Sequence, residues 1–152
     1  QMISGNARVR GSLRVYSDYR RTENKTKLFV HATELEAVNQ DNKVCKGRNE
    51  IFLDGFICKE PVYRVTPLRR EITDILVGVS RASKKIDYIP CICWGRCAQI
   101  AADYHIGTHI RVWGRMQSRV YEKRIGEEME LRTTYEVSVS IIEEVMDNEK
   151  YQ

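Results

Sequence analysis

Basic and aromatic residues alternate in the segment between Thr108 and Tyr121. In a β-strand, successive side chains point to opposite faces, so one face of this segment is predicted to be interior and the other exposed. The predicted interior face carries Ile110, Val112, Gly114, Met116 and Val120. The predicted outer face carries Arg111, Trp113, Arg115, Gln117, Arg119 and Tyr121. Guanidinium groups neutralise phosphates and flat rings stack on unpaired bases, so the outer face has the chemistry needed to hold a single nucleic-acid strand.

The segment 87–94 offers the same chemistry on a second strand. Cys91 and Cys93 share one parity, and Tyr88 and Trp94 share the other. If the small thiols face the interior, the two rings point outward. Each stacked base contributes about 1 to 3 kcal/mol whatever its identity, so such binding tolerates many sequences. For each of the two tryptophans, packing inside the protein or at a subunit interface is the alternative interpretation.

Arginines on or beside these strands are candidate phosphate ligands: Arg81, Arg96, Arg111, Arg115 and Arg119. The N-terminal segment repeats the alternation in a milder form, with Arg8, Arg10, Arg14 and Tyr16 on one parity. We treat this second set as a candidate extension of the binding path. A solvated, charged strand face is an equally good interpretation of it.

Cysteines and histidines in this region have the ligand types of a zinc site: Cys91, Cys93, Cys97, His105 and His109. Structural sites favour ligand pairs with about two to four residues between them at a turn, whereas Cys91 and Cys93 have one residue between them and fall within a strand, on the parity predicted to be interior. Buried free cysteine packs as a small apolar residue. Gly107 interrupts the helix that would align the two histidines, which we expect in a surface loop. We therefore predict no metal and no cofactor.

Three acidic residues lie close together in the sequence, Glu127, Glu128 and Glu130. Nuclease chemistry would need such a cluster to hold metal ions. They lie at the predicted tip of a Gly-containing hairpin, where solvated charge is the ordinary state. The sequence has no Gly-rich phosphate loop, nucleophile elbow or paired Cys/His nucleophile. We predict that the protein is not an enzyme.

Composition places weak limits on the partners. The chain has 152 residues, 25 Lys and Arg against 21 Asp and Glu, and a formal charge of +4, which permits a polyanionic partner without requiring one. An odd set of five cysteines without regular spacing indicates free thiols and a reducing compartment. Since no apolar stretch approaches the length of a membrane span, we expect a cytoplasmic, nucleoid-associated protein.

Alternating patterns dominate the sequence, so the fold class is predicted to be all-β. The predicted strands are 50–59, 71–81, 87–94, 108–121 and 131–144, with a helix over 96–104 between the third and fourth. Five strands with one helix in this position are the order of an OB-fold barrel. We assign residues 49–146 to this domain, 39–48 to a polar linker and 147–152 to a C-terminal tail.

The N-terminal segment, residues 1–38, is predicted to be a β-hairpin that repeats the last hairpin of the chain. VRGSLRVYSDY from Val9 aligns with VWGRMQSRVY from Val112, and ELEAV ending at Val38 is similar to IIEEV ending at Val145. The repeat implies the tail half of a second, truncated OB-like unit.

The run IDYIPCICWGRCAQIAADYHIGTHIRVWGRMQSRVYEK, from Ile86 to Lys123, resembles the bacterial single-stranded DNA-binding protein family. That family has an aromatic or hydrophobic strand ending in Gly-Lys or Gly-Arg, then a short helix ending in Tyr and Gly, then V-x-G-x-hydrophobic-x-[ST]-R-x-[YW]. Upstream, NEIFLDG from Asn49, Pro61, Arg64 and Val79-Ser80-Arg81 are similar to the family's opening strands. The resemblance covers Asn49 to about Val145.

By that resemblance, the stacking positions fall on Tyr88, Trp94 and Tyr121, and four OB folds assemble, usually as a homotetramer. The N-terminal hairpin resembles a tandem-OB variant, in which a dimer supplies four folds. The implied function is sequence-tolerant binding of single-stranded DNA during replication, recombination and repair, with replication or repair proteins as further partners. RNA binding and a primosome-type protein-interaction module are the alternatives, and competition between matched DNA and RNA oligonucleotides would separate them.

Overall fold

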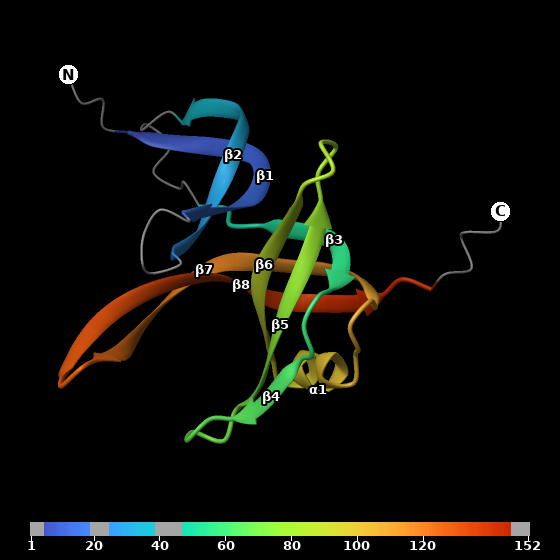
Figure 1. Ribbon diagram of the computed structural model, residues 1–152. Coiled ribbons are helices and arrows are strands. Elements are labelled where there is room, and N and C mark those ends of the chain that lie inside the picture. The colour runs from blue at the N-terminus through green and yellow to red at the C-terminus, as the bar shows by residue number, and fades with distance from the viewer. Residues whose placement is uncertain (1–4, 19–24, 39–46, 147–152) are drawn as a thin grey trace. The chain divides into compact units, whose positions relative to one another are not determined.

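The chain divides into two units, Gln1–Arg48 and Asn49–Gln152. The computed structural model describes residues 5–18, 25–38 and 47–146 (Figure 1). Most of the predicted linker, the predicted turn of the N-terminal hairpin around Arg21 to Lys25, and the predicted tail at 147–152 lie outside these described residues.

The described part of the second unit contains six strands and one short helix. They are β3 (Ile51–Ile57), β4 (Val62–Val65), β5 (Glu71–Ser80), β6 (Ile86–Trp94), α1 (Arg96–Ala102), β7 (His109–Ile125) and β8 (Glu128–Glu144). The strand order is β3-β7-β8-β6-β5-β4, and an additional pairing of β3 with β5 closes five strands into a barrel. β6 and β8 run parallel, and the other pairs are antiparallel. The predicted OB fold is confirmed.

The barrel interior follows the alternation of the strands. Leu53, Gly55 and Ile57 of β3 are buried, while the residues between them are exposed. Ile110 and Val112 of β7 are fully buried, as predicted. A side chain of this kind contributes about 1.5 to 3 kcal/mol when taken fully out of water. The helix α1 adds its buried Ala98 and Ala101, and it is joined to the sheet by a 2.7 Å hydrogen bond from Thr73 Oγ1 to the Ala98 carbonyl.

Strand β4 was not predicted. It has four residues, all exposed, and therefore lacks the apolar alternation by which the other strands were recognised. Its pairing with β5 places Tyr63 opposite Thr73 and Val65 opposite Glu71. In Figure 1, β4 lies at the edge of the sheet, close to α1, and leads into a hairpin turn.

The prediction that Val120 faces the interior is wrong, because its side chain is 63% exposed. β7 continues to Ile125 and β8 begins at Glu128, so both are longer than predicted. Beyond Gly114, β7 pairs only with β8, and the two form a ribbon that extends away from the barrel (Figure 1). We call residues 119–134 the arm. Water reaches both of its faces, so a period of two no longer separates inside from outside there.

The first unit is an antiparallel pair, β1 (Asn6–Asp18) and β2 (Lys25–Val38). Its register shifts between Arg10 and Gly11, as the β7–β8 register shifts between Trp113 and Gly114. In both places the strands approach so closely that only glycine fits. A Cβ on Gly11 would lie 2.1 Å from the His31 carbonyl oxygen, and one on Gly114 would lie 2.1 Å from that of Ser138. The hairpin therefore has the geometry of the barrel's last hairpin, as the internal repeat predicted.

The two hairpins differ in what covers their apolar face. In the barrel, Val112 is 0% exposed and Ile142 is 8% exposed. The equivalent residues of the first hairpin are Val9, which is 48% exposed, and Leu35, which is 74% exposed. Within the described residues, the first hairpin thus presents to water the face that forms the core of the barrel.

Candidate nucleic-acid interface

The surroundings of the outer face of β7 change along the strand, because β3 and β8 both pair with its first part and β8 alone pairs with the rest. Arg111 and Trp113 pair with Asp54 and Phe52 of β3, so they lie beside that strand. Farther along, Arg115 has only β8 beside it, and Arg119 and Tyr121 belong to the arm. The predicted single strip of arginines and rings is therefore divided into separate local environments along one strand.

Arg111 is held by carboxylates within the domain. Its Nε donates to Oδ2 of Asp54 at 3.1 Å, and Nη1 lies 4.0 Å from Glu143. Nε2 of His109 lies 2.5 Å from the other oxygen of Asp54. The hydrogen bond with His109, assisted by Arg111, lowers the pKa of Asp54 below its usual 3.8. His109, expected in a loop, is the first residue of β7 and is stacked on Phe56, with ring centroids 4.7 Å apart.

Trp113 belongs to a group of apolar side chains on the outside of the barrel. Its ring centroid is 5.2 Å from that of Phe52, and it pairs with Ile141 on its other side. Phe52, Phe56 and Ile141 are 54%, 47% and 58% exposed. We call Phe52, Phe56, Trp113 and Ile141 the outer apolar patch. The two phenylalanines were missed as candidates, although the alternation of β3 places both on the outer parity.

Arg115 and Arg119 differ in how they are paired. Arg119 Nε lies 3.2 Å from Oε1 of Glu136, a carboxylate that is almost completely buried. Gln117 donates to the same oxygen at 3.0 Å. Arg115 is exposed and, among the residues described, makes no ion pair. Its charge is therefore available to an anion from outside.

Three of the predicted stacking residues reach the surface, two on β6 and one on β7. Tyr88, near the start of β6, is 47% exposed, and Tyr121, in the arm, is 39% exposed. Trp94 is half-buried at the end of β6, where it pairs with Ile72. Phe56 shares a cross-strand row with Tyr88, because both pair with Gly78.

Arg81 and Arg96 have different surroundings. Arg81 donates twice to Asp87, at 2.6 and 2.5 Å, and this carboxylate is only 3% exposed. That bonding raises the pKa of Arg81 and makes the guanidinium the partner of a buried acid. Arg96 is exposed at the first residue of α1.

The candidate extension in the first unit is largely ion-paired. Arg8 lies 3.7 Å from Glu36, and Arg10 lies 3.3 Å from Glu34. Arg14 is half-buried, and Tyr16 is 56% exposed. These pairs are exposed, so each contributes little and yields readily to a competing phosphate.

Two of the three thiols considered as zinc ligands lie within the barrel, and the third, Cys97, is half-buried on α1. Cys91 is 2% exposed and Cys93 is 0% exposed, as their parity predicted. Burial raises the pKa of Cys93 to about 12 and that of Cys91 well above its ordinary value. The described residues hold no group of three or more His, Cys, Asp or Glu side chains suited to a metal ion. His105 is exposed, 4.0 Å from Glu60.

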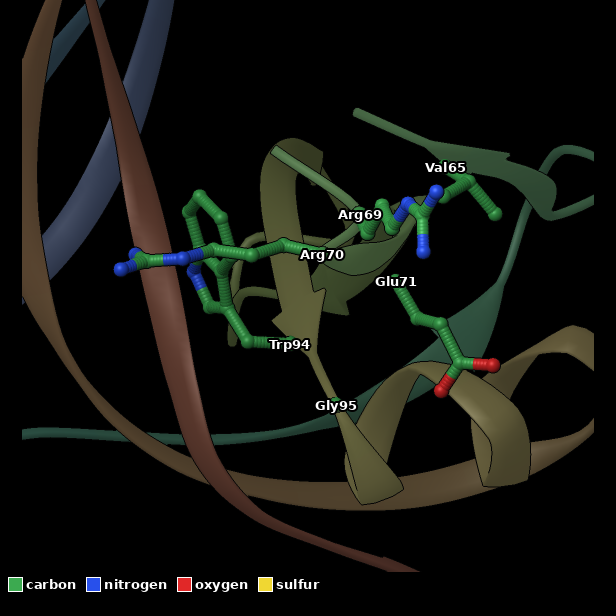
Figure 2. Close-up of a pocket in the computed structure, with 6 residues that line it drawn as sticks. All are labelled: Val65, Arg69, Arg70, Glu71, Trp94 and Gly95. Atoms are coloured by element: carbon green, nitrogen blue, oxygen red, sulfur yellow. The ribbon is translucent and has the colours of Figure 1, made fainter. Parts of the chain in front are cut away.

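A pocket that the sequence did not predict opens beside Trp94 (Figure 2). Its volume is about 590 Å³, and its lining comprises Val65, Arg69, Arg70, Glu71, Trp94 and Gly95. Two arginines from the β4–β5 turn thus meet a predicted stacking residue. No pattern of alternation marks them, since they lie in a turn.

Among the described residues, no helix has the length and apolar character needed to cross a membrane.

Relatives of known name cover most of the second unit. The single-stranded DNA-binding protein of Bacillus cereus is 29% identical over 102 residues, which are 62% of this chain and 60% of that protein. Single-stranded DNA-binding protein B of Bacillus subtilis is 31% identical over 85 residues, 51% of this chain and 75% of that protein. The chain thus spans about three fifths of the length of the Bacillus cereus relative.

A solved structure has the same fold. The crystal structure of the wild-type single-stranded DNA-binding protein from Thermus aquaticus matches with a TM-score of 0.72 and 18% identity, over 93% of this chain and 60% of that one. The profile of the single-strand binding protein family matches residues 48–145, which is more than half of the chain and includes the entire barrel. The chain therefore belongs to the single-strand binding protein family.

Proposed function

We propose that this chain binds single-stranded DNA, with little sequence preference, on the outer surface of its barrel. The observation that carries the proposal is the presence of exposed rings and an unpaired guanidinium on one small barrel: Tyr88 and Tyr121 are 47% and 39% exposed, and Arg115 has no carboxylate partner among the described residues. Single-strand binders combine these two chemistries. The names of its relatives support the same substrate.

In this proposal the stacking platforms are Tyr88, Trp94 and Tyr121. A large exposed ring costs solvation free energy unless it has a partner, and a base offers a flat apolar one. Trp113 is the less favourable platform, because Phe52 already packs against it at 5.2 Å.

The arginines divide into two groups. Arg115 and Arg96 are assigned to phosphates, because both are exposed. Arg81, Arg111 and Arg119 each hold a carboxylate of the domain, so a phosphate would have to compete with Asp87, Asp54 or Glu136. We assign these three a secondary role in which they raise the local positive potential.

The relatives are named as DNA-binding proteins, which favours a protein without catalytic activity. We propose that it protects single strands during replication, recombination and repair in the cytoplasm, in association with the nucleoid and with replication or repair proteins. The path is proposed to continue onto Arg8, Arg10, Arg14 and Tyr16 of the first unit.

The outer apolar patch supports a homo-oligomer, dimer or tetramer. Four large side chains on one wall of a barrel are typical of a protein contact surface. A second copy of this chain is the proposed occupant. The same patch is the observation that favours a protein-interaction module as the second candidate function.

A competition titration tests the DNA proposal. A labelled oligo-dT bound to the full chain is challenged with unlabelled single-stranded DNA, duplex DNA and RNA of matched sequence. We expect single-stranded DNA to compete best, and the logarithm of the binding constant to fall linearly with the logarithm of salt concentration. Equal or stronger competition by RNA would favour the RNA alternative. Binding that ignores salt, or no binding at all, would refute the proposal.

A further inference from the structure

Two consecutive arginines are presented by the turn between β4 and β5. The Arg69 amide donates to the Thr66 carbonyl at 2.8 Å, and the Thr66 amide donates to the Arg70 carbonyl at 2.9 Å. Thr66 Oγ1 accepts a further bond from the Arg70 amide at 3.1 Å. Arg69 has a φ of 60°, the left-handed conformation that closes the turn. Both side chains therefore leave the barrel from a fixed backbone.

The neighbouring carboxylates already have other partners. Glu71 accepts from the Tyr63 hydroxyl at 2.8 Å on one oxygen and from Gln99 Nε2 at 2.7 Å on the other. Asp74 pairs with Arg64 at 3.2 Å. Among the residues that the structure describes, Arg69 and Arg70 have no ion pair, and they leave two uncompensated positive charges at this end of the barrel.

Trp94 forms the apolar part of the same pocket. The Gly95 amide donates to the Glu71 carbonyl at 3.0 Å, and Trp94 pairs with Ile72, so the end of β6 is fixed against the start of β5. In Figure 2 the Trp94 ring lies on the side of the pocket to which Arg70 extends, while the Glu71 carboxylate points away from both. A Cβ built on Gly95 would meet nothing within 4 Å apart from its chain neighbours, so there is open space at Gly95, which lines the same pocket.

The volume of about 590 Å³ falls within the range of small-molecule sites, roughly 300 to 1,000 Å³. A ring, two guanidinium groups and open space together match the parts of one nucleotide. The ring would accept a base, and each guanidinium group would accept one of the two adjoining phosphates.

We propose that this pocket is a nucleotide subsite, in which the base lies against Trp94 and its two flanking phosphates are held by Arg70, which extends beside the ring, and by Arg69, which extends to the other side of the pocket (Figure 2). The inference rests on the proposed function and extends it, since it carries the DNA strand from the barrel wall onto the β4–β5 turn. Strand β4 then has a role, because it forms the support from which the arginine turn projects.

The test compares two double variants of the full chain, R69Q/R70Q and K84Q/K85Q. Lys84 and Lys85 lie in the turn between β5 and β6, and Lys84 has a φ of 67°, close to that of Arg69. The pairing of Ile72 with Trp94 and of Ser80 with Ile86 puts the two turns at opposite ends of the same strands. Both variants lose two positive charges from an equivalent turn, so they are matched in charge and in turn geometry and differ in place and in the type of cation removed.

We expect R69Q/R70Q to reduce the salt slope of oligo-dT binding by about 1.4, since each phosphate contact on a single strand contributes about 0.7. A slope difference of 1.4 means that the ratio of wild-type to variant affinity is about 25 times larger at 0.1 M salt than at 1 M salt, because each of the two contacts contributes a factor of about 10 to the power 0.7. K84Q/K85Q should keep the wild-type slope. Equal slopes in the two variants, whether unchanged or equally reduced, would overturn the subsite.

A fluorescence experiment separates this outcome from failure of the proposed function. The chain has two tryptophans, so Trp113→Phe leaves Trp94 as the reporter. If the full-length W113F protein binds oligo-dT without any change in Trp94 emission, the subsite is refuted while DNA binding stands. If the wild-type chain does not bind oligo-dT, the proposed function itself fails. Quenching of Trp94 that is lost in W113F/R69Q/R70Q at matched DNA and salt concentrations supports the subsite.

Discussion

Arg119 Nε lies 3.2 Å from Oε1 of Glu136, whose side chain is only 7% exposed. An arginine predicted to contact phosphate therefore also compensates an acid inside the domain. Removing one partner of such a pair leaves the other charge buried and without its full set of hydrogen bonds. The resulting loss of folding free energy is larger than the net stabilisation that the intact pair provides.

We predict that Arg119→Ala destabilises the fold, whereas Arg115→Ala does not. Arg119 is 43% exposed and Gln117 also donates to Glu136, so we place the loss at about 1 kcal/mol, the low end for an unsatisfied buried group. Urea denaturation measures it. Arg115→Ala should instead reduce the salt slope of DNA binding by about 0.7. Equal stability of the two variants would contradict this division of roles.

Asp54 should make stability depend on pH in the acid range. Its bonds to His109 and Arg111 lower its folded pKa below 3.8, so its stabilising contribution is complete above 3.8 and disappears as pH falls through the lower folded value. Asp54→Asn has no carboxyl group at this position, so this pH-dependent part of the stability is absent from the variant. Urea denaturation at a series of pH values should give curves for wild type and D54N that converge in acid, and parallel curves would argue against the pair.

Thiol reactivity should divide the described cysteines into two classes. Cys91 and Cys93 are buried with raised pKa values, so almost none of either is thiolate at neutral pH. Cys58 and Cys97 are half-buried. Labelling with iodoacetamide, followed by peptide mass spectrometry, should modify Cys58 and Cys97 well before the buried pair. Rapid labelling of Cys93 in the folded protein would show that the interior of the barrel is open.

The outer apolar patch can be tested by a matched pair of variants. Ile141 is 58% exposed within the patch, and Ile106 is 59% exposed in the loop before β7. Because a buried charge is costly at a subunit contact, Ile141→Glu should convert the oligomer to a smaller species, while Ile106→Glu should not. Light scattering gives the mass of each. A wild-type mass equal to that of one chain would refute a homo-oligomer at the concentration used.

The sequence predicted the fold well because five strands bury one face each. The inward positions of Ile110, Val112, Cys91 and Cys93 follow from alternation alone, and the structure confirms their burial. The repeat around Gly11 and Gly114 was also visible, since a glycine required by close strand approach stays in register with its neighbours.

Other features depend on contacts between segments far apart in the chain. Parity placed Arg111 outward, but only the pairing of β7 with β3 brings it to Asp54. Parity also treated Val120 as interior, although no third strand covers the arm. Ile92 shares the outer parity of Tyr88 and Trp94 and is nevertheless 1% exposed. Which outward positions are exposed depends on which other segments of the chain cover them, and alternation does not encode this.

The uncovered face of the first hairpin has a thermodynamic consequence. Val9 and Leu35 are exposed where their counterparts in the barrel are buried, and each therefore forgoes part of the roughly 1.5 to 3 kcal/mol that full burial of such a side chain contributes. A lone two-stranded ribbon is marginal in water. The population of the paired state of β1 and β2 must therefore depend on what covers these apolar side chains, and hydrogen exchange of the amides along the two strands would measure that population.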